Sequence, residues 1–227
     1  MSELTPFRPT GCAVFIVDYY VSRVYGLWHI EGREGKTFLR TAIARWIVAE
    51  NANISLAEEA VAAYAISKVL ARYAHGIDRC DTALVKSVYW PEATDDHGVF
   101  RGNGHEFAEF VIAFLREAGP TVHHISNIHV DLLTPSVARV QSYFMALHEQ
   151  LGDEIQMGGR YLDTFEKRDN EWRILERITL IDWNQTRPTT FYHGDDAIFS
   201  PLIRGIRGIE DRWYSWHTQP AQGGKAP

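Results

Sequence analysis

The feature that most constrains the fold of this chain is a change in the spacing of its apolar residues at Pro120. Before Pro120, apolar side chains recur every three or four residues, which is typical of amphipathic helices. After it, long runs are rich in Val, Ile, Tyr, Thr and Phe, which favour strands. Helices followed by consecutive strands predict an α+β domain, in which the helices pack against one curved and mostly antiparallel sheet.

The helical part contains clear start and stop signals. The sequence Ser55-Leu-Ala-Glu58 is a capping box, in which each end side chain can bond to the backbone of the other. Gly76 is expected to end this helix, because glycine readily adopts the left-handed conformation of helix ends. Pro91 is expected to stop the second helix. The helices predicted are residues 55–76, 81–89 and 104–117.

The strand part is divided by turn signals. Asp169-Asn170 fits a two-residue hairpin turn, since both side chains tolerate a positive φ. Arg160 and Asp163 are expected to be structural, as paired charges on neighbouring strands. The strands predicted are residues 121–133, 136–149, 156–168 and 171–184.

The two ends of the chain flank a predicted domain of residues 55–185. Residues 1–54 carry no motif and could form an additional α/β element or come from an incorrectly extended reading frame. Residues 186–227 form a tail whose aromatic side chains are expected to order it against the domain mouth or a neighbouring subunit. We therefore expect a homo-oligomer, either a dimer or a trimer.

Charge and hydropathy exclude several classes of partner. The formal net charge is -6 and there is no cluster of Lys and Arg, which argues against nucleic acid and anionic membranes. The most apolar stretch, residues 11–30, is interrupted by Asp18 and Arg23 and is not expected to cross a membrane. The only two cysteines, Cys12 and Cys80, do not indicate a disulfide framework, so a cytoplasmic location is expected.

Ten histidines raise the question of a metal site. His123 and His129 share a strand face, but six residues at about 3.3 Å each separate them by roughly 20 Å. His123 and His124 point to opposite faces of the strand. His97 and His105 flank a turn and lack a partner at the spacing of a metal site. Neither a metal nor a cofactor is therefore expected.

Four scattered side chains could instead carry out chemistry without a metal. Tyr73 and Asp78 bracket the end of the first helix, in the sequence Tyr73-Ala-His-Gly-Ile-Asp78. His123 opens the first long strand, and Arg177 lies on a largely apolar face of the last one. A guanidinium in such a position needs a charged partner or a wet pocket.

Each of these four residues also has a structural explanation that the sequence leaves open. Asp78 could cap the next helix, and Tyr73 continues an apolar stripe and could belong to the core. His123 could be a half-buried histidine with satisfied hydrogen bonds. Arg177 could pair at the surface with a nearby carboxylate such as Asp163.

The hairpin sequence Gly159-Arg-Tyr-Leu-Asp-Thr-Phe-Glu-Lys-Arg-Asp-Asn-Glu-Trp-Arg-Ile174 and these four residues resemble the SnoaL-like branch of the nuclear transport factor 2-like superfamily. The branch includes scytalone dehydratase, lindane dehydrochlorinase and bile acid 7α-dehydratase. The resemblance covers about residues 55–185. It implies a cone-shaped fold, in which a bent sheet wraps around helices and encloses a pocket.

The resemblance also implies a function, that of a cofactor-free lyase or isomerase acting on a small, mostly apolar cyclic substrate. His123 would take a proton from carbon, and Asp78 would fix the tautomer of its ring and stabilise the imidazolium. Tyr73 would donate to the departing or carbonyl oxygen. Arg177 would stabilise the developing anion.

Two further residues could contact the substrate, and one other class of function is possible. His124 adjoins His123, so a shift of one residue would bring it to the pocket, and Trp183 shares the predicted strand face of Arg177. Both are candidates for contact with the substrate. The alternative function is a non-catalytic ligand-binding or assembly module, such as the small subunit of a ring-hydroxylating dioxygenase, which would need a catalytic partner chain.

We predict that a chain shortened to residues 52–227 folds and keeps any activity, because every candidate chemical residue lies after residue 54. Circular dichroism and thermal unfolding of the shortened and full-length chains test this. Loss of cooperative unfolding in the shortened chain would show that the first 51 residues are structural.

Overall fold

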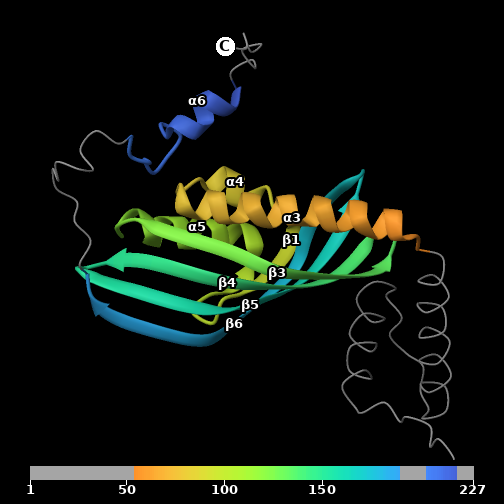
Figure 1. Cartoon of the computed structure of the whole chain (residues 1–227), viewed down its shortest axis with the longest axis horizontal. Coiled ribbons are helices and arrows are strands. Elements are labelled where there is room, and N and C mark those ends of the chain that lie inside the picture. Colours follow the sequence, from red (N-terminus) through yellow and green to blue (C-terminus); the bar gives the residue numbers. More distant parts are fainter. Residues whose placement is uncertain (1–53, 190–202, 219–227) are drawn as a thin grey trace, which may run out of the picture. The chain divides into compact units, whose positions relative to one another are not determined.

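The computed structural model describes residues 54–189 and 203–218 (Figure 1). The expectations for residues 1–53, and for the aromatic side chains between 190 and 202, lie outside this part of the chain. In the two described ranges, no helix is long and apolar enough to cross a membrane.

The core of the domain is one open sheet with six strands in the order β2-β1-β6-β5-β4-β3. Neighbouring strands are antiparallel, except that β1 runs parallel to β6. Asp169 and Asn170 both have positive φ and form the predicted hairpin turn between β5 and β6. The strands are β1 (Tyr89–Asp96), β2 (Arg101–Asn103), β3 (Thr121–Thr134), β4 (Val137–Gln150), β5 (Asp153–Arg168) and β6 (Glu171–Pro188).

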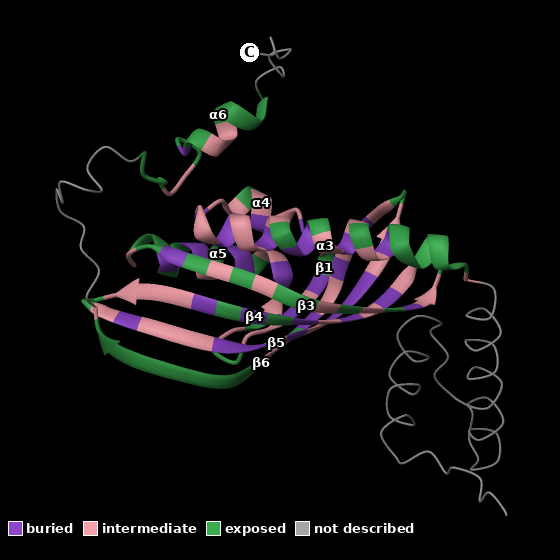
Figure 2. Ribbon diagram, in the orientation of Figure 1, coloured by how far each residue is buried: buried purple, intermediate pink, exposed green. Residues whose placement is uncertain are grey.

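Helices α3 and α5 cover the concave face of this sheet (Figure 1). The long helix α3 buries one apolar stripe, which includes Ile66, Leu70, Tyr73 and Ile77, while its opposite side stays exposed (Figure 2). Neither the apolar stripe of α3 nor the sheet can bury its apolar face by itself, so the two pack together. This packing confirms the predicted α+β architecture. The helices are α3 (Leu56–Asp78), α4 (Thr82–Lys86), α5 (Gly104–Arg116) and α6 (Arg212–Thr218).

Two helix boundaries predicted from glycine and proline are wrong. Gly76 does not end α3, which continues to Asp78; a Cβ at Gly76 would lie 2.8 Å from the side chain of Val85 in α4, so the glycine permits close packing. The second helix ends at Lys86, and Pro91 lies inside β1. Strand β1 was missed because it contains Pro91 and four polar residues, and β2 because it has only three residues; β1 pairs with β6, and β2 pairs with β1.

A β-bulge in β6 decides which of its side chains face the helices. Ile181 pairs with Gly159 and Trp183 pairs with Gly158, so one extra residue, Asp182, stands between the two pairs. Side chains alternate between the two faces of a strand, and one extra residue inverts the alternation beyond it. The even-numbered residues after the bulge, beginning with Asn184, therefore face the same side as Ile181.

Part of the aromatic tail packs against the ends of α3 and α5. The carboxylate of Asp211 pairs with Arg79 at 3.4 Å, and the ring of Trp213 lies 4.2 Å from that of His75. Arg207 donates a hydrogen bond to the carbonyl oxygen of Ala118 at 3.1 Å. These contacts fix residues 203–218 on the domain.

We predict that Gly159→Ala lowers the free energy of unfolding by about 3 kcal/mol, at the upper end of the usual cost of overpacking. A Cβ there would lie 1.9 Å from the carbonyl oxygen of Leu180, and backbone cannot move aside as a side chain can. The matched control is Gly102→Ala, whose Cβ would meet only the side chain of Phe100 at 3.1 Å. Urea unfolding measures both, and equal effects would contradict the prediction.

Candidate active site

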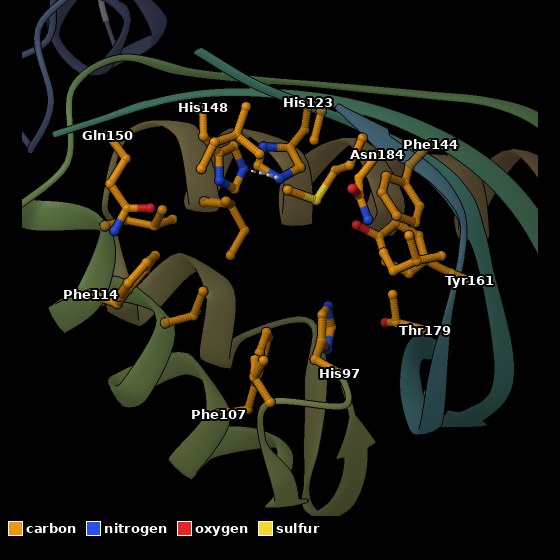
Figure 3. A pocket seen from close by; sticks show the side chains of 18 of the residues that line it. His97, Phe107, Phe114, His123, Phe144, His148, Gln150, Tyr161, Thr179 and Asn184 are labelled. Atoms are coloured by element: carbon orange, nitrogen blue, oxygen red, sulfur yellow. Dashed lines mark hydrogen bonds between the residues drawn. The ribbon is translucent and has the colours of Figure 1, made fainter. Parts of the chain in front are cut away.

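A cavity of about 490 Å³ lies between the concave face of the sheet and helices α3 and α5 (Figure 3). Its volume suits a small organic molecule. Most of its wall is apolar or aromatic, and a few polar side chains interrupt this surface. The polar side chains on the wall are Tyr73, His97, His123, His148, Gln150, Tyr161, Thr179, Asn184 and Thr186.

The predicted aspartate–histidine pair is present at the wall of this cavity. Nδ1 of His123 lies 2.7 Å from Oδ1 of Asp78, at the junction of the end of α3 with the start of β3. The backbone N–H of His123 and the hydroxyl of Thr121 also donate to this carboxylate, each at 3.0 Å. The distance is the one that base catalysis requires, while the catalytic role of the pair stays a prediction.

The carboxylate of Asp78 fixes the proton on the imidazole ring. Burial by itself would raise the pKa of Asp78, but the hydrogen bonds and charge of His123 outweigh it and hold that pKa below its usual value. An ionised carboxylate can only accept hydrogen bonds. Nδ1 of His123 therefore carries a proton, and in the neutral ring the lone pair is on Nε2.

A second histidine, His148 on β4, faces that lone pair. The Nε2 atoms of His148 and His123 are 3.4 Å apart, and both rings line the cavity (Figure 3). Burial, and then the nearby His123, lowers the pKa of His148 to about 4. His148 is therefore neutral near pH 7. No local pattern predicts this contact, because it depends on the pairing of β3 with β4.

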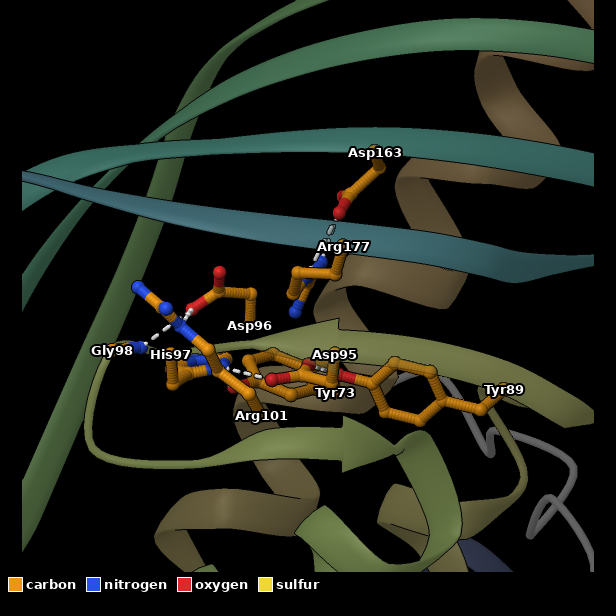
Figure 4. Close-up of polar contacts among 9 residues, drawn as sticks. All are labelled: Tyr73, Tyr89, Asp95, Asp96, His97, Gly98, Arg101, Asp163 and Arg177. Atoms are coloured by element: carbon orange, nitrogen blue, oxygen red, sulfur yellow. Dashed lines mark hydrogen bonds and ion pairs between the residues drawn. The ribbon is translucent and has the colours of Figure 1, made fainter. Parts of the chain in front are cut away.

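Another histidine, His97, lies across the cavity from His123 (Figure 3). Its Nδ1 donates to the carboxylate of Asp95, which also accepts a hydrogen bond from Tyr89 at 2.7 Å (Figure 4). The hydroxyl of Tyr73 lies 3.3 Å from Nε2 of His97 and can donate to it. The spacing Asp95-Asp96-His97 was the missed signal, since residues two apart on a strand share a face.

Tyr73 belongs to both the core and the cavity wall. It is 2% exposed, and its ring packs edge to face against those of Tyr89 and Tyr161. Burial raises the pKa of Tyr73 well above its usual value, so the hydroxyl keeps its proton. The two interpretations of Tyr73 from the sequence are therefore compatible.

Arg177 does not reach the cavity, contrary to its predicted position beside the substrate. It donates two hydrogen bonds to Asp163, at 2.7 and 2.8 Å, and both side chains are fully buried (Figure 4). Its guanidinium lies between the rings of Tyr73 and Tyr161, 4.3 and 4.1 Å from their centroids. The charge of a buried guanidinium must be compensated by nearby groups. For Arg177 these partners are the carboxylate of Asp163 and the two tyrosine rings.

The two residues predicted to contact the substrate also lie outside the cavity wall. His124 is exposed on the other face of β3, as the alternation of side chains requires. Trp183 lies beyond the bulge in β6, so it faces away from the cavity and packs over Gly158. Arg160 pairs with Asp182 on the neighbouring strand at 3.0 Å and is structural, as predicted.

No metal site is found in the described residues, where no three His, Cys, Asp or Glu side chains are arranged to hold an ion. Two histidines of the cavity wall are instead each held by a carboxylate. Asp78 holds His123, and Asp95 holds His97. Both are carboxylate–imidazole pairs, the arrangement that fixes a ring for proton transfer.

Comparison with known proteins places these observations in a family. The profile of the SnoaL-like domain matches residues 58–178, which is more than half of the chain. A search of curated proteins finds no match.

Solved structures share the fold at low identity. Hexachlorocyclohexane dehydrochlorinase LinA-type3 from Novosphingobium barchaimii superposes with a TM-score of 0.54 and 16% identity, covering 63% of this chain and 99% of the other. A putative scytalone dehydratase from Novosphingobium aromaticivorans gives 0.54 and 19%, covering 69% and 98%. At these identities the likeness shows the nuclear transport factor 2-like fold alone.

We predict that His148 makes the fold less stable in acid. Between pH 6.5 and about 4 the unfolded chain binds a proton at this residue that the folded protein excludes, so stability rises with pH across this window. Across this window the free energy of unfolding changes by about 2–3 kcal/mol because of His148. In His148→Gln, which cannot titrate, the loss of stability between about pH 7 and about pH 4.5 should shrink by this amount. Urea unfolding measures it. His124→Gln, at an exposed histidine, should leave the loss unchanged, and an equal loss in all three proteins would contradict the prediction.

Proposed function

Because the chain belongs to the SnoaL-like domain family, we propose that it is a cofactor-free lyase or isomerase for a small, mostly apolar cyclic molecule. One observation carries the proposal. Asp78 holds His123 at 2.7 Å, and His123 lines an apolar cavity of about 490 Å³ with its second ring nitrogen free to act as a base. Proton abstraction from carbon requires a positioned base of this kind.

His123 is the proposed base. Its Nε2 takes a proton from a carbon atom of the substrate, and the positive charge that forms on the ring is stabilised by the carboxylate of Asp78. Neutral imidazole suits this step because its ordinary pKa is near working pH. In a lyase the proton then leaves with the departing group, as water or a hydrogen halide. In an isomerase it returns to a different carbon.

Tyr73 and His97 are the proposed contacts for oxygen or halogen on the opposite wall. The Tyr73 hydroxyl can turn from His97, 3.3 Å away, to a departing or carbonyl oxygen in the cavity. Asp95 keeps the His97 ring in place behind it. This pair takes over part of the role that the sequence assigned to Arg177.

The wall composition supports a cyclic, mostly apolar substrate. Phenylalanine rings from α5 and β4, including Phe107, Phe114 and Phe144, form flat apolar surfaces (Figure 3). Polar contacts are confined to a few positions, which suits a molecule with one to a few oxygen or halogen substituents. Two structural neighbours carry the names of elimination enzymes, a dehydrochlorinase and a putative scytalone dehydratase, which supports the class of reaction.

The alternative, a non-catalytic module, is less favoured. A filled cavity, or an Asp78–His123 distance beyond hydrogen-bond reach, would have supported it. The structure has an open cavity of about 490 Å³ and a short hydrogen bond. A binding module also has no need for two carboxylate–imidazole pairs in one cavity.

The first experiment identifies ligands and then measures proton abstraction. Mass spectrometry of the purified protein detects co-purified apolar molecules, and these guide a panel of cyclic ketones, alcohols and halides. Nuclear magnetic resonance in D₂O then detects deuterium entering at carbon, which reports abstraction whether or not a group leaves. Absence of both exchange and product across the panel, with a ligand bound, would favour the non-catalytic module.

We predict that His123→Ala lowers the rate of exchange or turnover by about 10²–10⁴-fold while the protein remains folded. Asp78→Asn should be nearly as damaging, because the amide can present a donor to the ring and favour the wrong tautomer. His124→Ala is the matched control, since this neighbouring histidine is exposed on the other face of the sheet. Full activity in His123→Ala would rule out His123 as the base.

A further inference from the structure

The proposed reaction leaves a negative charge beside His123, whereas Tyr73 and His97 stand on the opposite wall of the cavity. Removal of a proton next to a carbonyl group places charge on the carbonyl oxygen, and preorganised donors at that oxygen are a large part of catalysis. Arg177 was the expected donor, but it is fully buried and bonded to Asp163. A donor must therefore come from the cavity wall near His123.

His148 is the polar side chain that faces the second ring nitrogen of the base. Its Nε2 lies 3.4 Å from Nε2 of His123, and both rings line the cavity. Because Asp78 keeps the proton of His123 on Nδ1, the facing Nε2 of His123 can only accept. The contact is a hydrogen bond only if His148 carries its proton on Nε2. At 3.4 Å this bond is weak and easily replaced.

The surroundings of His148 keep it neutral. The charged and titratable groups that act on it are His123 from β3, Asp78 from the end of α3, and Arg207 from the tail segment. Burial, His123 and Arg207 all disfavour a proton on the ring, and only Asp78 favours one. A neutral imidazole that donates from a fixed position can stabilise an oxyanion without giving up its proton.

We propose that His148 is a catalytic residue whose neutral Nε2–H donates to the oxyanion of an enolate formed at His123. The inference rests on the proposed function and narrows its substrate class to enolisable carbonyl compounds. In such a compound one atom separates the acidic carbon from the carbonyl oxygen. The base and the donor must therefore stand side by side, as the two Nε2 atoms do.

The step balances without any further reagent. Nε2 of His123 takes the proton from the α carbon, and the electrons of the C–H bond form a carbon–carbon double bond. The π electrons of the carbonyl group move onto its oxygen, which accepts the hydrogen bond from His148 in place of His123. The enolate then either expels a leaving group on the β carbon or, in a substrate with a carbon–carbon double bond between the β and γ carbons, takes the proton back at the γ carbon.

Binding of 4-nitrophenol tests the donor without any turnover. Its ionised form carries a phenolate oxygen that resembles an enolate and absorbs visible light, so titration gives the affinity of the anion directly. His148→Leu should weaken this affinity about 10–100-fold, the value of one hydrogen bond to a charged group. His148→Gln, whose amide N–H can replace the donor, should stay within about 3-fold of the unaltered protein. His124→Leu is the control and should bind normally.

The position of the proton is tested by a measurement that needs no variant. Long-range proton–nitrogen spectra of the protein labelled with ¹⁵N-histidine should show His148 protonated on Nε2 and His123 on Nδ1 at neutral pH. A proton on Nδ1 of His148 would overturn the proposal, as would normal anion binding by His148→Leu or no anion binding by the unaltered protein.

The outcomes separate this inference from the proposed function. If His123→Ala abolishes deuterium exchange but His148→Leu binds the phenolate normally, base catalysis stands and the role of His148 fails. If no compound exchanges but phenolate binding depends on His148, the oxyanion site stands and the enzyme reaction fails. If His123→Ala abolishes deuterium exchange, His148→Leu weakens phenolate binding and exchange is confined to carbonyl compounds, the proposed function and the role of His148 are both supported.

Discussion

The carboxylate of Asp78 is the interaction on which the rest of the site depends. It stands at the last turn of α3 and accepts three hydrogen bonds from the start of β3, two from His123 and one from Thr121. These bonds join helix to sheet at the edge of the cavity. The same bonds orient the imidazole, so one group both joins α3 to β3 and sets the position of the His123 ring.

Charged groups in this domain are arranged by the cost of removing them from water. Arg177 is always cationic and can be buried only with Asp163 and two tyrosine rings around it, which leaves it outside the cavity. Histidine can shed its charge, so His148 is tolerated at an apolar wall as a neutral ring. The cavity thus gains a polar donor without a net charge, which is compatible with an apolar ligand.

The sequence predicted the backbone of the domain well where signals were local. The capping box at Ser55 and the turn at Asp169-Asn170 mark element ends because their own side chains set the local conformation. The pairing of Asp78 with His123 came from a resemblance to known proteins rather than from spacing, since 45 residues separate them. Gly76 misled because glycine serves close packing as well as helix termination.

By itself, then, the sequence determined the order of the two long helices and the four long strands, because periodicity, caps and turns act within a few residues. Tertiary structure alone decided which side chains share the cavity. One extra residue at Asp182 turns Trp183 outward, and the pairing of β3 with β4 brings His148 to His123. Such outcomes depend on strand register, which is set by the packing of the whole sheet against its helices and is not encoded in any one segment.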